Sequence, residues 1–332
     1  MYSDIPICLA LAFVSVGLYV LAWSADRFVE GAEAVARALG VSPFVIGMVV
    51  IGFGTSAPEL AVSTLSGMAG HSNLSLGNAY GSNIFNIAAI LGVAVLIRPI
   101  TVRPVIVFAA VPMLLAASVA SGLLVCLGGG FSRLDGAWCL ALFAVLLPVY
   151  CYIDRKGKGN VGVGGISFPF PADGASSCRH PWLSLAGGLA LLVASSHVLV
   201  WGAVGIARSF GVSELLIGLT VIAAGTSLPE LASAIASARR GQNELALGNV
   251  IGSNFFNSLA VVGTSGAISP FMDVSSLVFT RDLPVMALLT LSIGIFGFNL
   301  RNPRLRGTIT RPCGIIWLAV FLVYLILLIR QE

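Results

Sequence analysis

The chain has 332 residues, of which 57% are hydrophobic and only 10% are charged, and its formal net charge is +4. A soluble domain carries about 25% charged residues, so this chain has too few of them to cover a surface that faces water. With a mean hydropathy of +0.98, the composition excludes a soluble globular protein and predicts a polytopic membrane protein. The basic residues are spread over separate loops, which argues against nucleic-acid binding.

Ten apolar segments are long enough to be membrane-spanning helices, which need roughly 20 residues each. The alternation typical of membrane β-strands is absent, so the predicted fold class is an all-α polytopic membrane protein. The first apolar run is too long for a cleavable signal and no Lys or Arg precedes it, so we expect it to be the first span. In chain order, the predicted spans are residues 5–25, 43–68, 74–97, 104–127, 134–153, 182–206, 213–237, 244–264, 283–300 and 312–329.

Lys and Arg concentrate on one side of these predicted spans. With the N-terminus outside, 14 of them lie at or near cytoplasmic loops and span ends, and 4 lie outside. Since basic residues favour the cytoplasmic side, we expect both termini outside. Residues 154–181, rich in Gly, Pro, Ser and charge, form the predicted cytoplasmic linker between two five-span units, residues 1–153 and 182–332.

The two halves repeat each other. GVSPFVIGMVVIGFGTSAPELA (40–61) aligns with GVSELLIGLTVIAAGTSLPELA (211–232), and LGNAYGSNIFNIAAILG (76–92) aligns with LGNVIGSNFFNSLAVVG (247–263), always 171 positions apart. Because each half has an odd number of spans, the second half enters the membrane from the opposite side. The sequence therefore predicts two five-helix inverted-topology repeats, a layout whose substrate site lies near the membrane midplane on interrupted helices.

Each repeat contains a proline deep inside an apolar span. Pro58 and Pro229 cannot donate a hydrogen bond to the carbonyls of Gly54 and Gly225, four residues earlier. A carbonyl freed in lipid needs another partner, and Na⁺ and Ca²⁺ accept backbone carbonyls as ligands. Glycine at this position also lets another group come close.

Directly after each proline comes a glutamate, with a threonine and a serine four and three residues before it. This spacing places the three side chains on one helical face. The two sets are Thr55, Ser56 and Glu59, and Thr226, Ser227 and Glu230. A carboxylate at the centre of a membrane helix costs roughly 2.5–3.5 kcal/mol, a cost that a bound cation offsets. A single Pro-Glu pair also fits a simple kink, but its duplication favours an ion site.

A second duplicated motif supplies neutral oxygens at a spacing of four residues. The two polar stripes are Asn78, Ser82 and Asn86, and Asn249, Ser253 and Asn257. Alone, such stripes also fit close helix packing. Opposite two glutamates they predict a site of carboxylate, hydroxyl, amide and carbonyl oxygens without Cys or His, which suits hard ions and argues against zinc or copper. Two carboxylates are neutralised by one Ca²⁺, two Na⁺ or two H⁺, and such competition is what an exchanger needs.

The motifs GTSAPE and GTSLPE, together with GSNIFN and GSNFFN, resemble the paired alpha-repeats of the cation/Ca²⁺ antiporter family, and especially its prokaryotic Na⁺/Ca²⁺ exchangers. The resemblance covers nearly the whole chain. It implies ten helices, with the second, third, seventh and eighth bundled at the midplane and the first and sixth as a gating pair. It implies Glu59 and Glu230 as Ca²⁺ carboxylates, completed by Asn86 and Asn257. The implied Na⁺ ligands are Thr55, Ser56, Thr226, Ser227, Ser82 and Ser253.

One departure from the family bears on the ions carried. Some relatives, including K⁺-dependent exchangers, have Asp where this chain has Asn257, so the resemblance here favours K⁺-independent exchange. The predicted function is a Ca²⁺/Na⁺ antiporter of the plasma membrane (the inner membrane in a Gram-negative cell) that extrudes Ca²⁺ by alternating access. An H⁺/Ca²⁺ antiporter and a cation channel remain the alternatives. We predict no enzymatic activity, no cofactor and no obligate protein partner; Ca²⁺, Na⁺ and the lipid bilayer are the expected partners.

Overall fold

The computed structural model describes residues 6–127, 130–157, 178–210, 223–272, 274–303 and 305–331. Within these ranges, eight helices are long and apolar enough to cross a membrane, and nine if the bent pair Pro43–Thr55 and Ala57–Met68 is one span. The prediction of a helical membrane protein is therefore confirmed. Residues 213–222 of the seventh predicted span, and residues 158–177 of the predicted linker, lie outside the described residues.

Helices follow one another along the chain, and several contain π-helical turns, labelled η. The first half comprises α1 (Ile7–Leu39), α2 (Pro43–Ile46), η1 (Gly47–Ile51), α3 (Gly52–Thr55), α4 (Ala57–Met68), α5 (Ser72–Phe85), η2 (Asn86–Leu91), α6 (Gly92–Ile97), β1 (Ile100–Val102), η3 (Ile106–Ala110), α7 (Val111–Leu127) and α8 (Arg133–Gly157).

In the second half the described elements are α9 (Pro181–Ser209), α11 (Ala223–Thr226), α12 (Leu228–Arg239), α13 (Asn243–Phe256), η5 (Asn257–Val261), α14 (Val262–Ile268), η6 (Val278–Asp282), α15 (Leu283–Gly297), β2 (Gly307–Ile309) and α16 (Arg311–Gln331). The internal repeat of the sequence is visible in these bounds. α3, α4 and α5 begin and end 171 positions before α11, α12 and α13, respectively.

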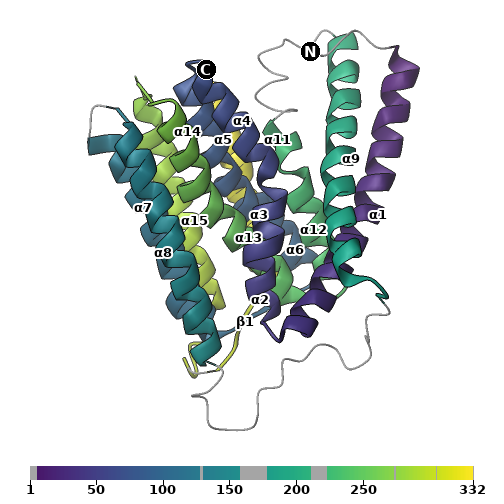
Figure 1. Ribbon diagram of the computed structural model, residues 1–332, viewed down its shortest axis with the longest axis vertical. Helices are drawn as coiled ribbons and strands as arrows, with labels where there is room; N and C mark the ends of the chain where they lie inside the picture. Colours follow the sequence, from purple (N-terminus) through teal and green to yellow (C-terminus); the bar gives the residue numbers. More distant parts are fainter. Residues whose placement is uncertain are drawn as a thin grey trace.

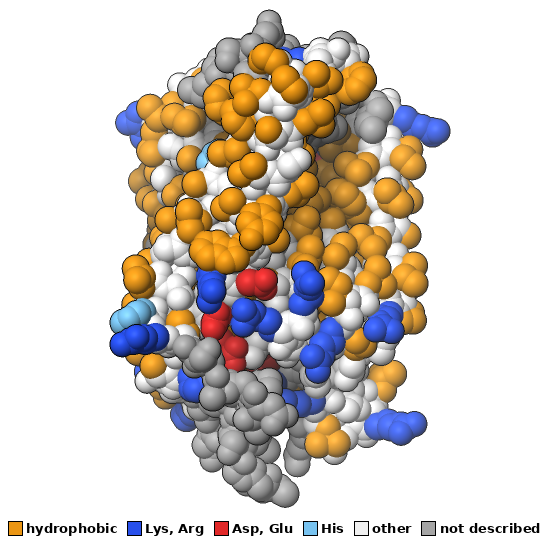
Figure 2. All heavy atoms as spheres, turned by 90° about the vertical axis from the view of Figure 1, so that its right-hand side faces the viewer, with side chains coloured by type: hydrophobic (Ala, Val, Ile, Leu, Met, Phe, Trp, Pro, Cys, Tyr) orange, Lys and Arg blue, Asp and Glu red, His pale blue; other side chains and the backbone are white. Residues whose placement is uncertain are grey.

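α1 is longer than the sequence pattern indicated. The first predicted span ends at residue 25, but the helix continues to Leu39. Its charged last turns are paired: Arg240 lies 3.6 Å from Asp26 and 3.8 Å from Glu30, and Arg37 lies 2.8 Å from Glu33. Figure 2 shows basic and acidic side chains gathered below an apolar band on this face. In this extension the carboxylates have cationic partners, and Phe28, Ala32 and Val35 are buried against neighbouring helices.

α1 and α9 pack side by side at one edge of the molecule (Figure 1). Glycines permit the close approach: a β-carbon on Gly17 would lie 2.9 Å from Leu199, and one on Gly31 would lie 2.5 Å from the backbone nitrogen of Leu185. As residue numbers rise along α1, those of its contacts fall along α9, so the two helices are antiparallel.

The centre of the molecule is built from interrupted helices and from the span Asn243–Ile268, formed by α13, η5 and α14, whose most apolar part is entirely buried. Close packing again depends on small residues, because a β-carbon on Gly252 would overlap the backbone of Met48, and one on Gly248 would overlap that of Phe44. α13 therefore lies directly against the segment α2–η1–α3 that leads into the first duplicated Pro-Glu.

At one end of the bundle, the loops are held together by a short two-stranded sheet and by ion pairs between buried side chains. β1 pairs antiparallel with β2, with Ile100 opposite Ile309. Next to the sheet, Arg103 lies 2.9 Å from Asp154 and 3.1 Å from Glu244. Burial alone would lower the pKa of Arg103, but Glu244 and Asp154 raise it overall. These side-chain ion pairs connect α8 to the start of α13, and none of the residues of the predicted cation-binding site takes part in them.

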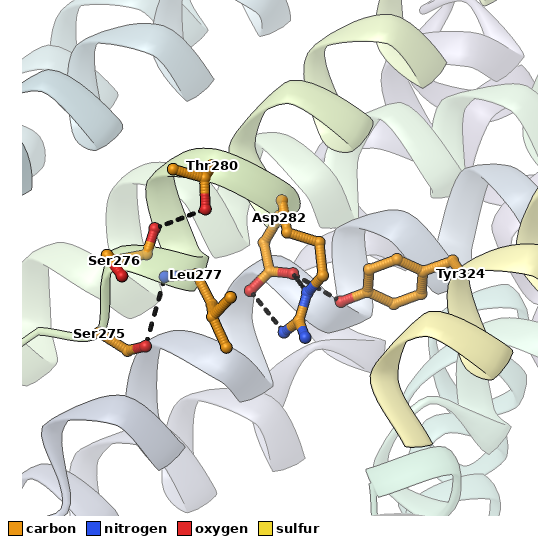
Figure 3. Close-up of polar contacts among 7 residues, drawn as sticks. Ser275, Ser276, Leu277, Thr280, Asp282 and Tyr324 are labelled. Atoms are coloured by element: carbon orange, nitrogen blue, oxygen red, sulfur yellow. Dashed lines mark hydrogen bonds and ion pairs between the residues drawn. The ribbon is translucent and has the colours of Figure 1, made fainter. Parts of the chain in front are cut away.

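A second buried carboxylate, Asp282 of η6, is also paired internally. Its oxygens accept hydrogen bonds from Arg281 at 2.7 Å and from the hydroxyl of Tyr324 at 3.0 Å. Figure 3 shows the hydroxyl of Tyr324 directed at Asp282, and this hydrogen bond links η6 to α16. Because Asp282 already has a cationic partner, it differs from the two glutamates of the duplicated motif.

Candidate ion-binding site

The duplicated Pro-Glu motif lies at a break in a helix in both halves. Ser56 separates α3 from α4, and Ser227 separates α11 from α12. At the first break the axis bends by 44°. Each proline lies in the first turn of the new helix and is followed by the glutamate. Glu59 and Glu230 therefore lie at helix N-termini, where the positive end of the helix dipole favours a carboxylate.

The two glutamates are held by serines from the opposite half of the chain. The hydroxyl of Ser227 donates to Oε1 of Glu59 at 2.9 Å, and the hydroxyl of Ser56 donates to Oε1 of Glu230 at 3.0 Å. Both glutamates are completely buried. Their Oε2 atoms have no hydrogen-bond partner within the described ranges. Each carboxylate thus keeps one oxygen free for a further ligand.

The remaining predicted hydroxyls lie around this pair. The hydroxyls of Ser227 and Ser82 lie 3.4 Å apart, and Ser253 donates to the carbonyl of Gly52 at 3.3 Å. Thr55 donates to the carbonyl of Ile51 at 3.0 Å. The structure buries all twelve predicted site residues: Thr55, Ser56, Glu59, Ser82, Asn86, Thr226, Ser227, Glu230, Ser253, Asn257, Gly54 and Gly225.

Asn86 and Asn257 each begin a π-helical turn, η2 and η5, a feature that is frequent at functional sites. The amide nitrogen of Asn86 donates to Oδ1 of Asn254 at 3.0 Å. Oδ1 of Asn86 and both polar side-chain atoms of Asn257 are buried without a hydrogen-bond partner in the part of the chain that the structure describes. Like the free glutamate oxygens, these atoms are available to a ligand.

The two glycines before the break make room for a neighbouring helix. A β-carbon on Gly54 would lie 2.7 Å from the side chain of Leu189, and one on Gly225 would overlap that of Val200. Both neighbours belong to α9, which therefore covers the breaks closely. The role of the Gly54 and Gly225 carbonyls as ligands stays a prediction.

Asn78 and Asn249 act differently from the rest of their stripes. Asn78 donates to the backbone carbonyl of Glu59 at 3.1 Å and to Ser63 at 2.8 Å. Asn249 repeats this with the carbonyl of Glu230 at 3.2 Å. They fasten the helix that bears each glutamate to the next helix. We did not predict this role from the sequence, although the identical residues at aligned positions were a signal of it.

Chemically, the site offers only oxygen ligands. Across the described residues, no three or more His, Cys, Asp and Glu side chains gather where they could hold a metal ion together. The groups bonded to the two carboxylates are the hydroxyl oxygens of Ser227 and Ser56. Such ligands suit hard cations such as Na⁺ and Ca²⁺.

Known proteins are similar to this chain over most of its length. Residues 9–151 and 180–330 match the family described as sodium/calcium exchanger protein. The chain is 37% identical to inner membrane protein YrbG of Escherichia coli (strain K12), with 94% of this chain and 96% of YrbG covered. It is 31% identical to sodium/calcium exchanger MaX1 of Methanosarcina acetivorans, with 84% and 89% covered. It superposes with a TM-score of 0.80 on the sodium-calcium exchanger NCX_Mj soaked with Na⁺ and Sr²⁺, at 29% identity, with 96% and 98% covered.

Proposed function

Because this chain belongs to the sodium/calcium exchanger protein family, we propose that it is a secondary antiporter that exchanges Ca²⁺ for Na⁺ across a membrane. The observation that carries the proposal is the reciprocal pairing of Ser227 with Glu59 and Ser56 with Glu230, which joins both halves at one buried site. MaX1 is named a sodium/calcium exchanger, and NCX_Mj was soaked with Na⁺ and Sr²⁺.

Charge explains why one site would serve both ions. Ionised Glu59 and Glu230 carry two negative charges, which one Ca²⁺ or two Na⁺ would neutralise. A site without either ion would hold both charges in a low-dielectric medium, where charges are costly. An unloaded carrier should therefore resist switching between its two sides, and this resistance couples the two fluxes.

In the proposed site, Ca²⁺ lies between the free Oε2 atoms of Glu59 and Glu230, and the side chains of Asn86 and Asn257 complete its ligands. Na⁺ ions bind beside it. The proposed Na⁺ ligands are the hydroxyls of Thr55, Ser56, Thr226, Ser227, Ser82 and Ser253, and the carbonyls of Gly54 and Gly225 are further ligands. The burial of all these residues supports the assignment.

For the whole chain we propose ten spans in two inverted repeats, residues 1–153 and 182–332, with residues 154–181 as a cytoplasmic linker. The antiparallel packing of α1 against α9, and the constant offset between α4 and α12, support a two-fold axis in the membrane plane. Alternating access would then be a movement of α1 and α9 over the central helices. The excess of Lys and Arg on the linker side supports a plasma-membrane protein with both termini outside.

Asn257 bears on the coupling ion. An amide at this position adds no negative charge, so Ca²⁺ or two Na⁺ suffice for neutrality without K⁺. We therefore propose K⁺-independent exchange, with Na⁺ entry driving Ca²⁺ extrusion.

The test is ⁴⁵Ca²⁺ uptake into proteoliposomes that hold Na⁺, K⁺ or choline inside, at equal pH on both sides. Uptake that requires internal Na⁺ and ignores K⁺ is the expected result. Uptake without a Na⁺ gradient would contradict the proposal, and a protonophore would then separate an H⁺/Ca²⁺ antiporter from a cation channel.

A further inference from the structure

We propose that Asn254 is a positioning residue that fixes the side-chain amide of Asn86 so that its carbonyl oxygen faces the transported ion. This inference rests on the proposed function, because it assumes that Asn86 is an ion ligand. Asn254 is the first asparagine of GSNFFN (252–257), and it is not one of the proposed ion ligands.

A chain of two hydrogen bonds determines the orientation. The nitrogen of the Asn254 side chain donates to the backbone carbonyl of Asn83 at 3.1 Å. A backbone carbonyl can only accept, so this end of the Asn254 amide must be its nitrogen. Oδ1 of Asn254 is thereby directed at Asn86, which donates its own amide nitrogen at 3.0 Å.

The orientation of Asn86 follows from the same logic. Its amide nitrogen is already used by Asn254, so Oδ1 of Asn86 points elsewhere and is buried without a hydrogen-bond partner among the described residues. A side-chain amide turned the other way would present its N–H₂ group, which is electropositive, to a cation. Asn254 therefore stabilises the ligand-competent orientation of Asn86 over the inverted one.

The second half of the site has no such arrangement among the described residues. By the repeat, Asn83 corresponds to Asn254 and Asn257 corresponds to Asn86. However, the amide nitrogen of Asn83 donates to Ser258 at 2.9 Å and to the sulfur of Met286 at 3.3 Å. Neither polar atom of Asn257 has a partner in the described chain. Of the two proposed amide ligands, only Asn86 is held in one orientation by a hydrogen bond within the described chain. The two halves of the site therefore differ chemically.

The experiment compares equilibrium ⁴⁵Ca²⁺ binding and Na⁺-driven ⁴⁵Ca²⁺ uptake in Asn254→Leu and in the matched control Ser258→Ala. Leu resembles Asn in size but can neither accept the hydrogen bond from Asn86 nor donate the one to the Asn83 carbonyl. Ser258 lies one turn further along, bonds to Asn83 and does not bond to Asn86. We expect Asn254→Leu to weaken Ca²⁺ binding about tenfold, the effect of losing the single hydrogen bond that orients Asn86, and Ser258→Ala to bind Ca²⁺ like the wild type. If Asn254→Leu is not monodisperse, the smaller Asn254→Ala replaces it.

A second comparison separates positioning from a structural role. In an Asn86→Ala background residue 86 has no side-chain oxygen to orient, so Asn254→Leu should have no further effect on Ca²⁺ binding. An equal loss in both backgrounds, or equal binding by Asn254→Leu and Ser258→Ala, would overturn the inference. Wild-type protein that binds Ca²⁺ without Na⁺-driven uptake would instead contradict the proposed exchange and leave the binding comparison intact. Absence of Ca²⁺ binding would overturn both.

Discussion

Replacing Glu59 by glutamine should remove Ca²⁺ exchange because it leaves a buried charge unbalanced. Glu59 and Glu230 are both completely buried. In the Glu59→Gln variant, Ca²⁺ bound beside a neutral amide and an ionised Glu230 would leave one excess positive charge in the site. An uncompensated charge at the centre of a membrane helix costs roughly 2.5–3.5 kcal/mol. Since about 1.4 kcal/mol is a tenfold change in affinity, Ca²⁺ binding should weaken roughly 60- to 300-fold in this variant.

The assay is Na⁺-driven ⁴⁵Ca²⁺ uptake over a range of external Ca²⁺, together with size-exclusion chromatography to establish that each variant is folded. Glu33→Gln is the matched control, because Glu33 is also buried but is paired with Arg37 at 2.8 Å. Its uptake should remain close to that of the wild type. A Glu59→Gln variant whose half-saturating Ca²⁺ concentration stays within about threefold of the wild type would refute the charge argument built on this site.

Three further predictions test the hydroxyls, the coupling ion and the packing. Ser227→Ala removes the hydrogen bond to Glu59, and we expect the half-saturating Na⁺ concentration in exchange assays to rise about tenfold; an unchanged value would exclude Ser227 as a Na⁺ ligand. Asn257→Asp adds a third negative charge, so Na⁺-driven uptake should become dependent on K⁺ or H⁺; K⁺ and pH titrations that match the wild type would contradict this. Gly252→Ala places a β-carbon against the backbone of Met48 and should destabilise the protein by about 1–3 kcal/mol, measured as a lower Tm, whereas Gly187→Ala, where nothing lies within 4 Å, should leave the Tm unchanged.

Several elements could be predicted because their signals are local. The lengths of the apolar segments predicted most of the spans to within a few residues; for example, the predicted span 182–206 corresponds to the helix Pro181–Ser209. Pro58 and Pro229 indicated interrupted helices, because proline lacks the backbone N–H that donates the helical hydrogen bond, whatever its surroundings. The family resemblance, carried by the same duplicated motifs, is confirmed by the match over residues 9–151 and 180–330.

Other features depended on partners distant in the chain. The last turns of α1 contain charged residues, so a prediction based on apolar residues alone ends the first span before them. The helix continues to Leu39 and contacts residues more than 200 positions away: Phe28 and Ala32 share a core cluster with Ala236, and Arg240 pairs with Asp26 and Glu30. Similarly, Asn78 resembles an ion ligand in its stripe, but it fastens the backbone of Glu59 instead.

The sequence by itself determined which residues repeat, where the helices break and which oxygens are available, since these follow from residue type and spacing. The tertiary structure decided which of these groups form hydrogen bonds with one another. Ser227 bonds to Glu59 and Ser56 to Glu230 across the two halves, and Asn254 orients Asn86 while Asn83 turns to Ser258. A repeat of identical residues is symmetric in sequence, but hydrogen bonds form between individual atoms whose positions only the packed helices fix.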